Sequence, residues 1–589
     1  MRKLLLILGI FLWASQVWGA TYYMRADGTA SNKAAATSCS SASTAMSVAT
    51  HNSQIFSPDD VICLCDDGGV YKTSIIVPST GTRGHPIVYR NANGKTPVID
   101  VSYLDSSSGW TDLGTGIYTK QLSVRPWVMW ENDVPLKVAS STVCSDGNWF
   151  GYNNSQGLTY YKPTSGTPAK HSLRFVHGTT PAGMDIRNKS YLTIYGLTFN
   201  RCWYGIRHGS DKTNANVDIS GLSIHDNNFN KVYWAIYGDI LNDRVESDVT
   251  IYNNLIDYCN CGISAWSGSK NNKTKLQYNK NFSITNNTII NHAAISDSMT
   301  WADALMNLYW FSDHEGISFQ DVQNSTIADN KITVSYSQNF SLGSQYATRG
   351  IYIYQNTSAR ATSGNKILRN KLTGHFSPAI YMSGYGASGY ENNIIAYNVM
   401  SYSEAYNVQS FFSVNFEDAN TLTGTNYFAN NTIYAASNIG ACFRMPNKLT
   451  GTWIVRNNIM RSGGSYVNIS SYQDSGTLTF DHNLYYGKPD QWGFQIGVTG
   501  MTFITWKNRG YDLVGSRIAD PLFTNAPRGI FTINSSSPAK WAGVNLGLST
   551  DYAGKPVHNP PSIGAYEYVE SKTGSSSLRA PTGFRRGTQ

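Results

Sequence analysis

The sequence predicts an all-β protein built from stacked repeats, and three observations support this prediction. The chain has 589 residues, more than the roughly 250–300 residues that one compact core usually supports. Only 14% of the residues are charged, whereas Gly, Asn, Ser, Thr and Tyr are plentiful and long helix-forming stretches are absent. The third observation is a short segment that recurs along most of the chain.

The recurring segment has apolar residues in rough alternation, then Asn, then another apolar residue. Alternation with a period of two marks a strand, and Asn suits a turn because it tolerates left-handed backbone angles. The copies recur about every 25–43 residues, which suits one coil of a solenoid plus loops of varying length. The copies are residues 192–199, 222–229, 249–256, 282–289, 325–332, 365–372, 393–400, 427–433, 453–459 and 478–484.

Stacked coils would place equivalent residues about 4.8 Å apart, so that each strand pairs with the coils before and after it. The recurring Asn residues would then form a ladder, which is known to stabilise stacked strands. The first copy has Leu197 at this position. A β-propeller lacks an Asn at one fixed place in each unit, and leucine-rich repeats show a Leu-dominated pattern. The predicted ladder is Asn227, Asn254, Asn287, Asn330, Asn370, Asn398, Asn431, Asn458 and Asn483.

Segments outside the repeats carry a family resemblance. Residues 56–62, 68–71, 75–82, 85–89 and 96–100 look like first coils, and residues 537–539, 542–543 and 563–567 look like a closing segment of many bacterial members. With the repeats, these motifs resemble the pectate-lyase-like superfamily of right-handed parallel β-helices. The resemblance implies that fold and leaves the reaction open, because one fold hosts many chemistries.

The chain divides into five segments. Residues 1–20 are predicted to be a signal peptide, because a positive start, an apolar run from Leu4 to Trp13 and a small-residue exit near Gly19 are typical of one. The run is too short to cross a bilayer core of about 30 Å. We therefore expect a secreted protein without a membrane span. We also expect it to be a monomer. Residues 21–102 would form the N-terminal coils, 103–178 a β-rich insertion, 179–570 the main β-helix with its closing segment, and 571–589 a disordered tail.

Charge and cysteines narrow the possible partners. The formal net charge of +8 fits an acidic polysaccharide such as a uronate polymer, and a neutral one almost as well. No dense Lys/Arg patch of the kind that nucleic-acid binders use is present. Eight cysteines in an exported protein permit disulfides. The C-x-C pairs Cys63/Cys65 and Cys259/Cys261 differ from the C-x-x-C spacing of zinc and redox motifs, so we interpret them as structural.

A second strand follows the Asn turn in most coils and begins with a small residue and an apolar one. If the apolar residue points inward, the next one points outward. Outward aromatic rings offer apolar faces and polar tips that suit sugars, although aromatics also simply favour strands. The first outward column would be Arg207, Tyr237, Ser264, Ser318, Tyr352 and Tyr381, and the second Asp239, Trp266, Gln320, Tyr354 and Ser383. The predicted substrate-binding residues are Arg207, Tyr237, Trp266, Gln320 and Tyr354.

Two long gaps between strands, near residues 291–313 and 333–348, adjoin the predicted reactive cluster. Long loops on a rigid scaffold often carry function. The cluster contains Asp313-His314-Glu315, and Arg349 falls in the same column as Glu315 on the next coil. A stacked ion pair that holds the loops explains this pair equally well. The predicted catalytic residues are Asp313, His314, Glu315, Arg349, Tyr352 and Tyr381.

The roles of these residues depend on the reaction. In a lyase acting on a uronate, Arg349 would neutralise the carboxylate, and His314, Tyr352 or Tyr381 would supply the base and the acid. His changes charge near neutral pH, whereas a Tyr needs Arg nearby to lower its pKa. A hydrolase needs two carboxylates about 5–5.5 Å or about 6.5–9.5 Å apart. Asp313 and Glu315 are candidates, with Asp239 a poor third.

The sequence favours a polysaccharide lyase that works by β-elimination. A non-catalytic surface binder or adhesin could use the same aromatic face without acid or base. A glycoside hydrolase and a C5 epimerase also remain open; Asp313-His314 is similar to the Asp-Pro-His of alginate epimerases but lacks the Pro. Many members of the superfamily that this sequence resembles use calcium, so Ca²⁺ is a possible cofactor. No metal ligand is assigned, because the expected outer face has no dense Asp cluster.

Overall fold

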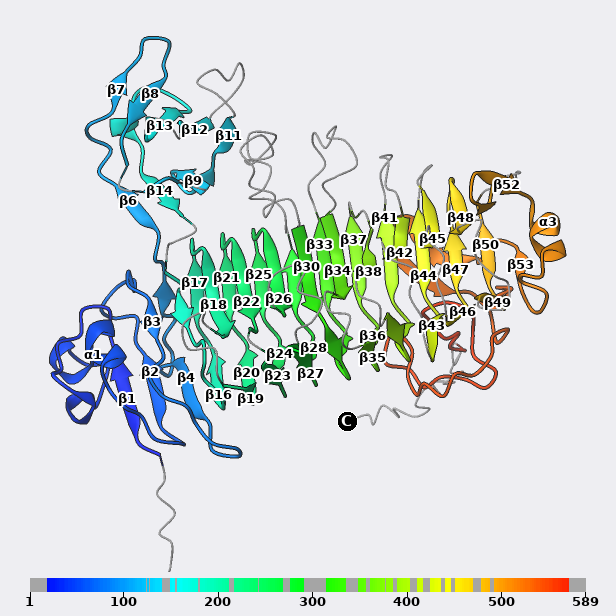
Figure 1. Ribbon diagram of the computed structural model, residues 1–589, viewed down its shortest axis with the longest axis horizontal. Coiled ribbons are helices and arrows are strands. Elements are labelled where there is room, and N and C mark those ends of the chain that lie inside the picture. The colour runs from blue at the N-terminus through cyan, green and yellow to red at the C-terminus, as the bar shows by residue number, and fades with distance from the viewer. Residues whose placement is uncertain are drawn as a thin grey trace, which may run out of the picture.

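Three long sheets run side by side along one solenoid in the computed structural model (Figure 1). From residue 87 to residue 496 the coils pass through sheet A, sheet B and sheet C in turn. In the part of the chain that the structure describes, six coils add a short fourth strand, sheet D, before the next sheet A strand. All neighbours within sheets A, B and D are parallel, and in sheet C only the final pair is antiparallel. The protein is therefore a right-handed parallel β-helix, as the sequence predicts.

The structure describes residues 19–122, 124–126, 128–139, 149–153, 156–177, 181–210, 217–241, 243–267, 276–290, 314–334, 348–355, 361–374, 376, 378–384, 389–402, 410–416, 424–435, 440–445, 451–469, 478–487 and 492–570. The predicted signal peptide, apart from its last two residues, and the predicted tail at 571–589 lie outside these residues.

Sheet A contains β1 (Thr21–Met24), β2 (Val61–Leu64), β4 (Ile87–Asn91), β16 (Leu192–Tyr195), β20 (Leu222–His225), β24 (Thr250–Tyr252), β28 (Ser283–Thr285), β32 (Thr326–Ala328), β36 (Lys366–Leu368), β40 (Ile394–Ala396), β43 (Thr425–Ala429), β46 (Thr452–Arg456) and β49 (Leu478–Asp481). Sheet B contains β5 (Val98–Ile99), β17 (Thr198–Asn200), β21 (Asn228–Asn230), β25 (Leu255–Asp257), β29 (Thr288–Ile290), β33 (Lys331–Val334), β37 (Lys371–Gly374), β41 (Val399–Tyr402), β44 (Thr432–Ala435), β47 (Ile459–Arg461), β50 (Leu484–Tyr486) and β53 (Arg517–Ile518).

Sheet C contains β3 (Ile75–Ile76), β15 (Met184–Asp185), β18 (Tyr204–Gly209), β22 (Trp234–Asp239), β26 (Cys261–Trp266), β30 (His314–Gln320), β34 (Thr348–Gln355), β38 (Ile380–Gly384), β42 (Ser410–Phe416), β45 (Ala441–Met445), β48 (Ser465–Ile469), β51 (Phe494–Ile496) and β52 (Thr499–Met501). Sheet D contains β19 (Ile219–Ser220), β23 (Val245–Ser247), β27 (Tyr278–Lys280), β31 (Val322–Gln323), β35 (Thr362–Ser363) and β39 (Tyr390–Glu391).

The core is a set of apolar columns inside the coils. In sheet C, Ile206, Ile236 and Ile263 are direct partners on successive strands, and all are fully buried. Burying one such side chain stabilises the fold by about 1.5–3 kcal/mol. This inward column fixes which residues of sheet C point outward, because side chains alternate along a strand.

The predicted Asn ladder is present and fully hydrogen-bonded along its length. Each Asn Nδ2 donates to the Oδ1 of the next member at 3.0–3.2 Å, from Asn227 to Asn483. The left-handed residue, however, is the one before each ladder Asn, such as Asn253 before Asn254 and Arg369 before Asn370. The ladder Asn acts through its side chain, and its neighbour makes the turn.

A second ladder, which the sequence analysis did not identify, lies at the turn into sheet A. Asn365 Nδ2 donates to Asn393 Oδ1 at 3.0 Å, and Asn393 Nδ2 donates to Asn426 Oδ1 at 2.9 Å. Ser325 starts the row by donating its backbone N–H to Asn365 Oδ1. Two buried polar rows therefore fix the register of these coils.

A lateral subdomain is inserted between β5 of sheet B and β15 of sheet C, at the N-terminal end of the solenoid (Figure 1). Its core includes Met129, Phe150 and Phe175. One of its sheets contains β10 (Val134–Pro135), β9 (Val128–Glu131), β14 (Leu173–Val176) and β6 (Tyr103–Asp105). The other contains β11 (Lys137–Ala139), β12 (Trp149–Asn153), β13 (Leu158–Lys162), β8 (Tyr118–Lys120) and β7 (Thr111–Asp112).

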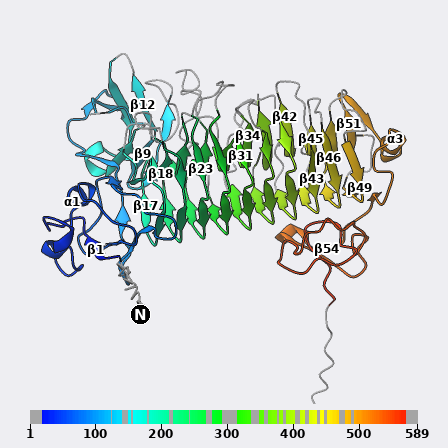
Figure 2. The ribbon, with the colours of Figure 1, turned by 60° about the horizontal axis from the view of Figure 1, so that its bottom comes forward.

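Both ends of the solenoid are closed. α1 (Val48–Asn52) lies at the N-terminal end, and α3 (Phe503–Asn508) places Trp506 against Phe480 and Phe494 at the C-terminal end. The closing segment then returns alongside the last coils (Figure 2). It carries β54 (Phe523–Asn525) and β55 (Ile530–Ile533), and the Gly564 N–H donates to the Asn457 carbonyl. Short 3-10 turns occur at Lys33–Ala35, Ala42–Thr44, Pro168–Lys170 and Ala526–Arg528.

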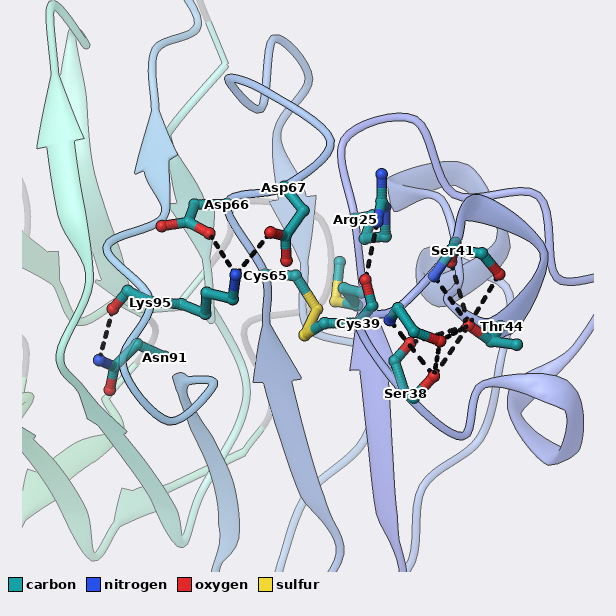
Figure 3. The surroundings of a disulfide bond; sticks show 12 residues. Arg25, Ser38, Cys39, Ser41, Thr44, Cys65, Asp66, Asp67, Asn91 and Lys95 are labelled. Atoms are coloured by element: carbon teal, nitrogen blue, oxygen red, sulfur yellow. Dashed lines mark hydrogen bonds and ion pairs between the residues drawn. A yellow bond between two sulfur atoms is a disulfide. The ribbon is translucent and has the colours of Figure 1, made fainter.

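One disulfide joins Cys39 to Cys65 in the N-terminal coils (Figure 3). Cys65 follows strand β2, so the bond fastens the N-terminal excursion to sheet A. Cys63, Cys202, Cys259, Cys261 and Cys442 are buried. The C-x-C cysteines thus have structural positions, with one member of the first pair in the disulfide.

Candidate functional site

The first outward column of sheet C is continuous in register. Arg207 pairs with Tyr237, Tyr237 with Ser264, and Ser264 with Ser318. Ser318 pairs with Tyr352, which pairs with Tyr381. The structure thus brings residues more than 170 positions apart in sequence onto one face, because parallel coils stack without slipping.

The second outward column differs from the sequence prediction in its exposure. Asp239 pairs with Trp266, and Gln320 with Tyr354. Trp266 is partly exposed, but Gln320 is only 3% and Tyr354 only 4% exposed. The expectation that Tyr354 is an exposed ring is therefore wrong. The Tyr352 ring lies 5.7 Å away at 45° and helps to cover it, and Gln320 Oε1 accepts from the Ser267 N–H.

Glu315 and Arg349 form an ion pair at the edge of this face. Arg349 Nη1 donates to Glu315 Oε1 at 3.0 Å, with the Glu315 side chain 1% and the Arg349 side chain 12% exposed. Cys261 Sγ donates to the other carboxylate oxygen at 3.8 Å. Breaking a buried pair by removing one partner costs about 3–5 kcal/mol, so Glu315 holds Arg349 in place.

Two tyrosines lie against this arginine. The Arg349 guanidinium is 4.3 Å from the centre of the Tyr352 ring and 5.0 Å from that of Tyr381. The two rings stack at 5.4 Å and 13°, and the Tyr352 hydroxyl lies 3.1 Å from Ser383 Oγ. This group places a cation beside two phenolic hydroxyls, so it could bind an anion and move a proton.

Two of the predicted catalytic groups lie outside the described part of the site. Asp313 precedes the described residues of β30, and the side chain of His314 is not among those described. The backbone of His314 pairs with Thr348. The separation of the two carboxylates that a hydrolase requires therefore stays a prediction.

A cluster of aromatic rings lies two to four coils before the coil of Arg349; we call Tyr204, Trp234, Tyr237 and Trp266 the aromatic corner. Trp234 contacts Tyr237 at 5.0 Å and Trp266 at 5.5 Å, and Tyr237 contacts Trp266 at 5.9 Å. Tyr204 lies 5.0 Å from Tyr237. Tyr237 and Trp266 were predicted from the sequence to bind substrate, whereas Tyr204 and Trp234 were not among the predicted site residues.

The lateral subdomain contributes to this cluster. Trp130, Val128 and Val176 of the subdomain share one apolar cluster with Trp203 and Tyr233 of the solenoid. Tyr204, Tyr237 and Trp266 pack against the same cluster. The sequence alone does not show this apolar cluster, because the cluster joins segments that are far apart in the chain.

The charges of the corner favour binding over proton transfer. Burial, and then the nearby Asp239, raise the pKa of Tyr237 well above its usual value. The Tyr237 phenol therefore stays neutral and can donate a hydrogen bond. The Arg207 guanidinium lies 4.7 Å over the Tyr204 ring, which places a cation beside the rings.

The described residues show no group of three or more His, Cys, Asp or Glu side chains that could hold a metal ion. Calcium therefore has no assigned ligands in this part of the chain. Within the same residues, no helix is long and apolar enough to cross a membrane.

Solved structures are similar to this chain at low sequence identity. The structure of XylC in complex with xylose is 12% identical, with a TM-score of 0.50 over 93% of this chain and 98% of that one. A glycoside hydrolase is 8% identical, with a TM-score of 0.40 over 88% and 99%. Pectate lyase Pel9A is 12% identical, with a TM-score of 0.31 over 93% and 96%. No family model matches the sequence, and the search of curated proteins gives no match.

Proposed function

We propose that this chain is a secreted, polysaccharide-active β-helix protein that cleaves an acidic, uronate-containing polysaccharide by β-elimination on the outer face of sheet C. The observation that carries the proposal is the position of the Arg349 guanidinium over both Tyr352 and Tyr381, 4.3 and 5.0 Å from their rings. It combines a cation for a carboxylate with phenols for proton transfer on one outer face. The solved β-helix proteins named for polysaccharide lyases and glycoside hydrolases are compatible with it.

The chemistry assigns a role to each group. Arg349 binds the uronate carboxylate; a guanidinium has five N–H donors, so its pair with Glu315 is compatible with a second carboxylate. Tyr352 takes the C5 proton as phenolate, the C5–H electrons form the C4–C5 double bond, and the C4–O bond breaks. Tyr381 or His314 then protonates the leaving oxygen. Arg207, Tyr237 and Trp266 bind neighbouring sugars.

The test is a panel of alginate, pectate and glycosaminoglycans. We expect at least one to yield unsaturated ends, which absorb ultraviolet light. New reducing ends without this absorbance would replace the lyase by a hydrolase, and conversion of the uronate without chain cleavage would replace it by a C5 epimerase. A parallel incubation with a calcium chelator tests calcium dependence.

A non-catalytic polysaccharide binder is the second candidate, and one observation favours it. Glu315 is fully buried and neutralises Arg349, while Asp185 likewise pairs with Arg187 beside the same face. Ion pairs of this kind are as compatible with binding a polysaccharide as they are with catalysis. Polysaccharide binding without any product would select this candidate.

Export and a monomeric state belong to the same proposal. The signal-like sequence of residues 1–20 supports export. Recovery of the mature chain from culture medium, with an N-terminus near Thr21, would test export. Light scattering would test the monomeric state.

A further inference from the structure

Three rings of the aromatic corner meet at steep angles, whereas the planes of Tyr204 and Tyr237 differ by 33°. The ring planes of Trp234 and Trp266 differ by 87°, those of Tyr237 and Trp266 by 63°, and those of Trp234 and Tyr237 by 62°. In an edge-to-face pair, one ring covers only part of the other's face. The partly exposed Tyr237 and Trp266 can therefore present ring faces to a ligand.

Two other outward aromatic groups of this solenoid differ in this respect. Tyr352 and Tyr381 stack at 13°, with Arg349 over both. On sheet A, His225 stacks between Tyr195 and Tyr252 at 10° and 11°. Parallel stacking makes each ring cover the next, so these groups present mainly ring edges. The tilted arrangement is thus not a general consequence of aromatic residues on stacked strands.

A hydrogen bond and a buried apolar cluster hold the aromatic corner rigid. Trp266 Nε1 donates to Ser318 Oγ at 3.2 Å, which fixes the indole. Behind it, Trp203 stacks on Tyr233 at 3.9 Å, and Trp130 of the lateral subdomain joins the same cluster. A surface that is ordered before binding loses little conformational entropy when a ligand arrives.

Polar groups flank the rings. Arg207 is the direct partner of Tyr237 on the preceding strand, and Asp239 is the partner of Trp266. A sugar ring has C–H groups on its faces and hydroxyls around its edge. Ring faces flanked by a cation and a carboxylate match both features.

We propose that the aromatic corner is a separate sugar-binding subsite, supported by the lateral subdomain, that holds a part of the polysaccharide distant from the part that lies at Tyr352. Tyr237 and Tyr352 are three coil steps apart, or about 14 Å at about 4.8 Å per step. The ligand must then be an extended chain rather than a single sugar. This inference rests on the polysaccharide binding in the proposed function, and not on the lyase chemistry.

The test compares Trp266→Ala with Trp266→Phe and with Tyr252→Ala, a control on an outward aromatic of sheet A. Binding to polygalacturonate, alginate and xylan is measured by affinity electrophoresis, with thermal melts to check folding. We expect Trp266→Ala to bind the polymer that the wild type binds roughly tenfold more weakly, the loss of one ring contact. Trp266→Phe should retain most binding, and Tyr252→Ala should bind as the wild type does.

Several results would overturn the subsite: unchanged binding by folded Trp266→Ala, an equal loss in Tyr252→Ala, or no wild-type binding to any of the three polymers. The failure of the two proposals is distinguishable. Trp266-dependent binding without unsaturated products removes the lyase and keeps the subsite. Unsaturated products formed equally well by the wild type and Trp266→Ala, with equal binding, remove the subsite and keep the lyase.

Discussion

Replacing Asn330 by Ala tests the ladder on which the stacking of the coils depends. Asn330 is fully buried. Its Nδ2 donates to the Ile284 carbonyl at 2.9 Å and to Asn370 Oδ1 at 3.0 Å. Its Oδ1 accepts from the backbone N–H and Nδ2 of Asn287, both at 3.0 Å. Alanine removes all four bonds and leaves their partners buried.

The expected loss follows from this count. Four hydrogen bonds at about 0.5–1.5 kcal/mol each give about 2–6 kcal/mol, and the unsatisfied partners place the result in the upper half of that range. Asn228→Ala is the matched control, because Asn228 is exposed on β21, and it should change stability by less than about 0.5 kcal/mol. Urea unfolding followed by circular dichroism measures both variants. Equal midpoints for the two variants would refute the ladder's role.

Three further predictions concern the site and pH. Tyr352→Phe should abolish formation of unsaturated ends while polymer binding stays within about twofold; full activity would remove Tyr352 as the base. Glu315→Gln should destabilise the fold by about 3–5 kcal/mol, because it leaves the Arg349 charge buried without its carboxylate, and an unchanged urea midpoint would contradict this. Burial lowers the pKa of His51 to about 4, below the unfolded value of about 6.5. Its contribution of about 3 kcal/mol should therefore be complete above pH 6.5 and be lost as pH falls toward 4. His51→Gln should flatten the urea midpoint over that interval, and an unchanged pH profile would disprove the assignment.

The sequence predicts the fold and the outward column of sheet C for a simple reason. Period-two alternation and one Asn per coil determine which residues share a column. The register from Arg207 to Tyr381 follows from these two features alone. The role of each residue in that column remains a prediction.

Features that depend on the neighbours of a side chain were not predictable in this way. Tyr354 points outward in register yet is buried, because the Tyr352 ring covers part of it. The apolar cluster that Trp130 shares with Trp203 and Tyr233 requires the subdomain to fold back on the solenoid. The alternation of residues along a strand shows on which face a side chain lies. It does not show which other side chains contact it.

The most direct test of the central claim is a crystal structure of the Tyr352→Phe variant soaked with an oligosaccharide of the polymer that the wild type binds. We predict sugar density along the outer face of sheet C, from the Trp266 indole to the Arg349 guanidinium. Density confined to sheet A, sheet B or the closing segment would contradict the account.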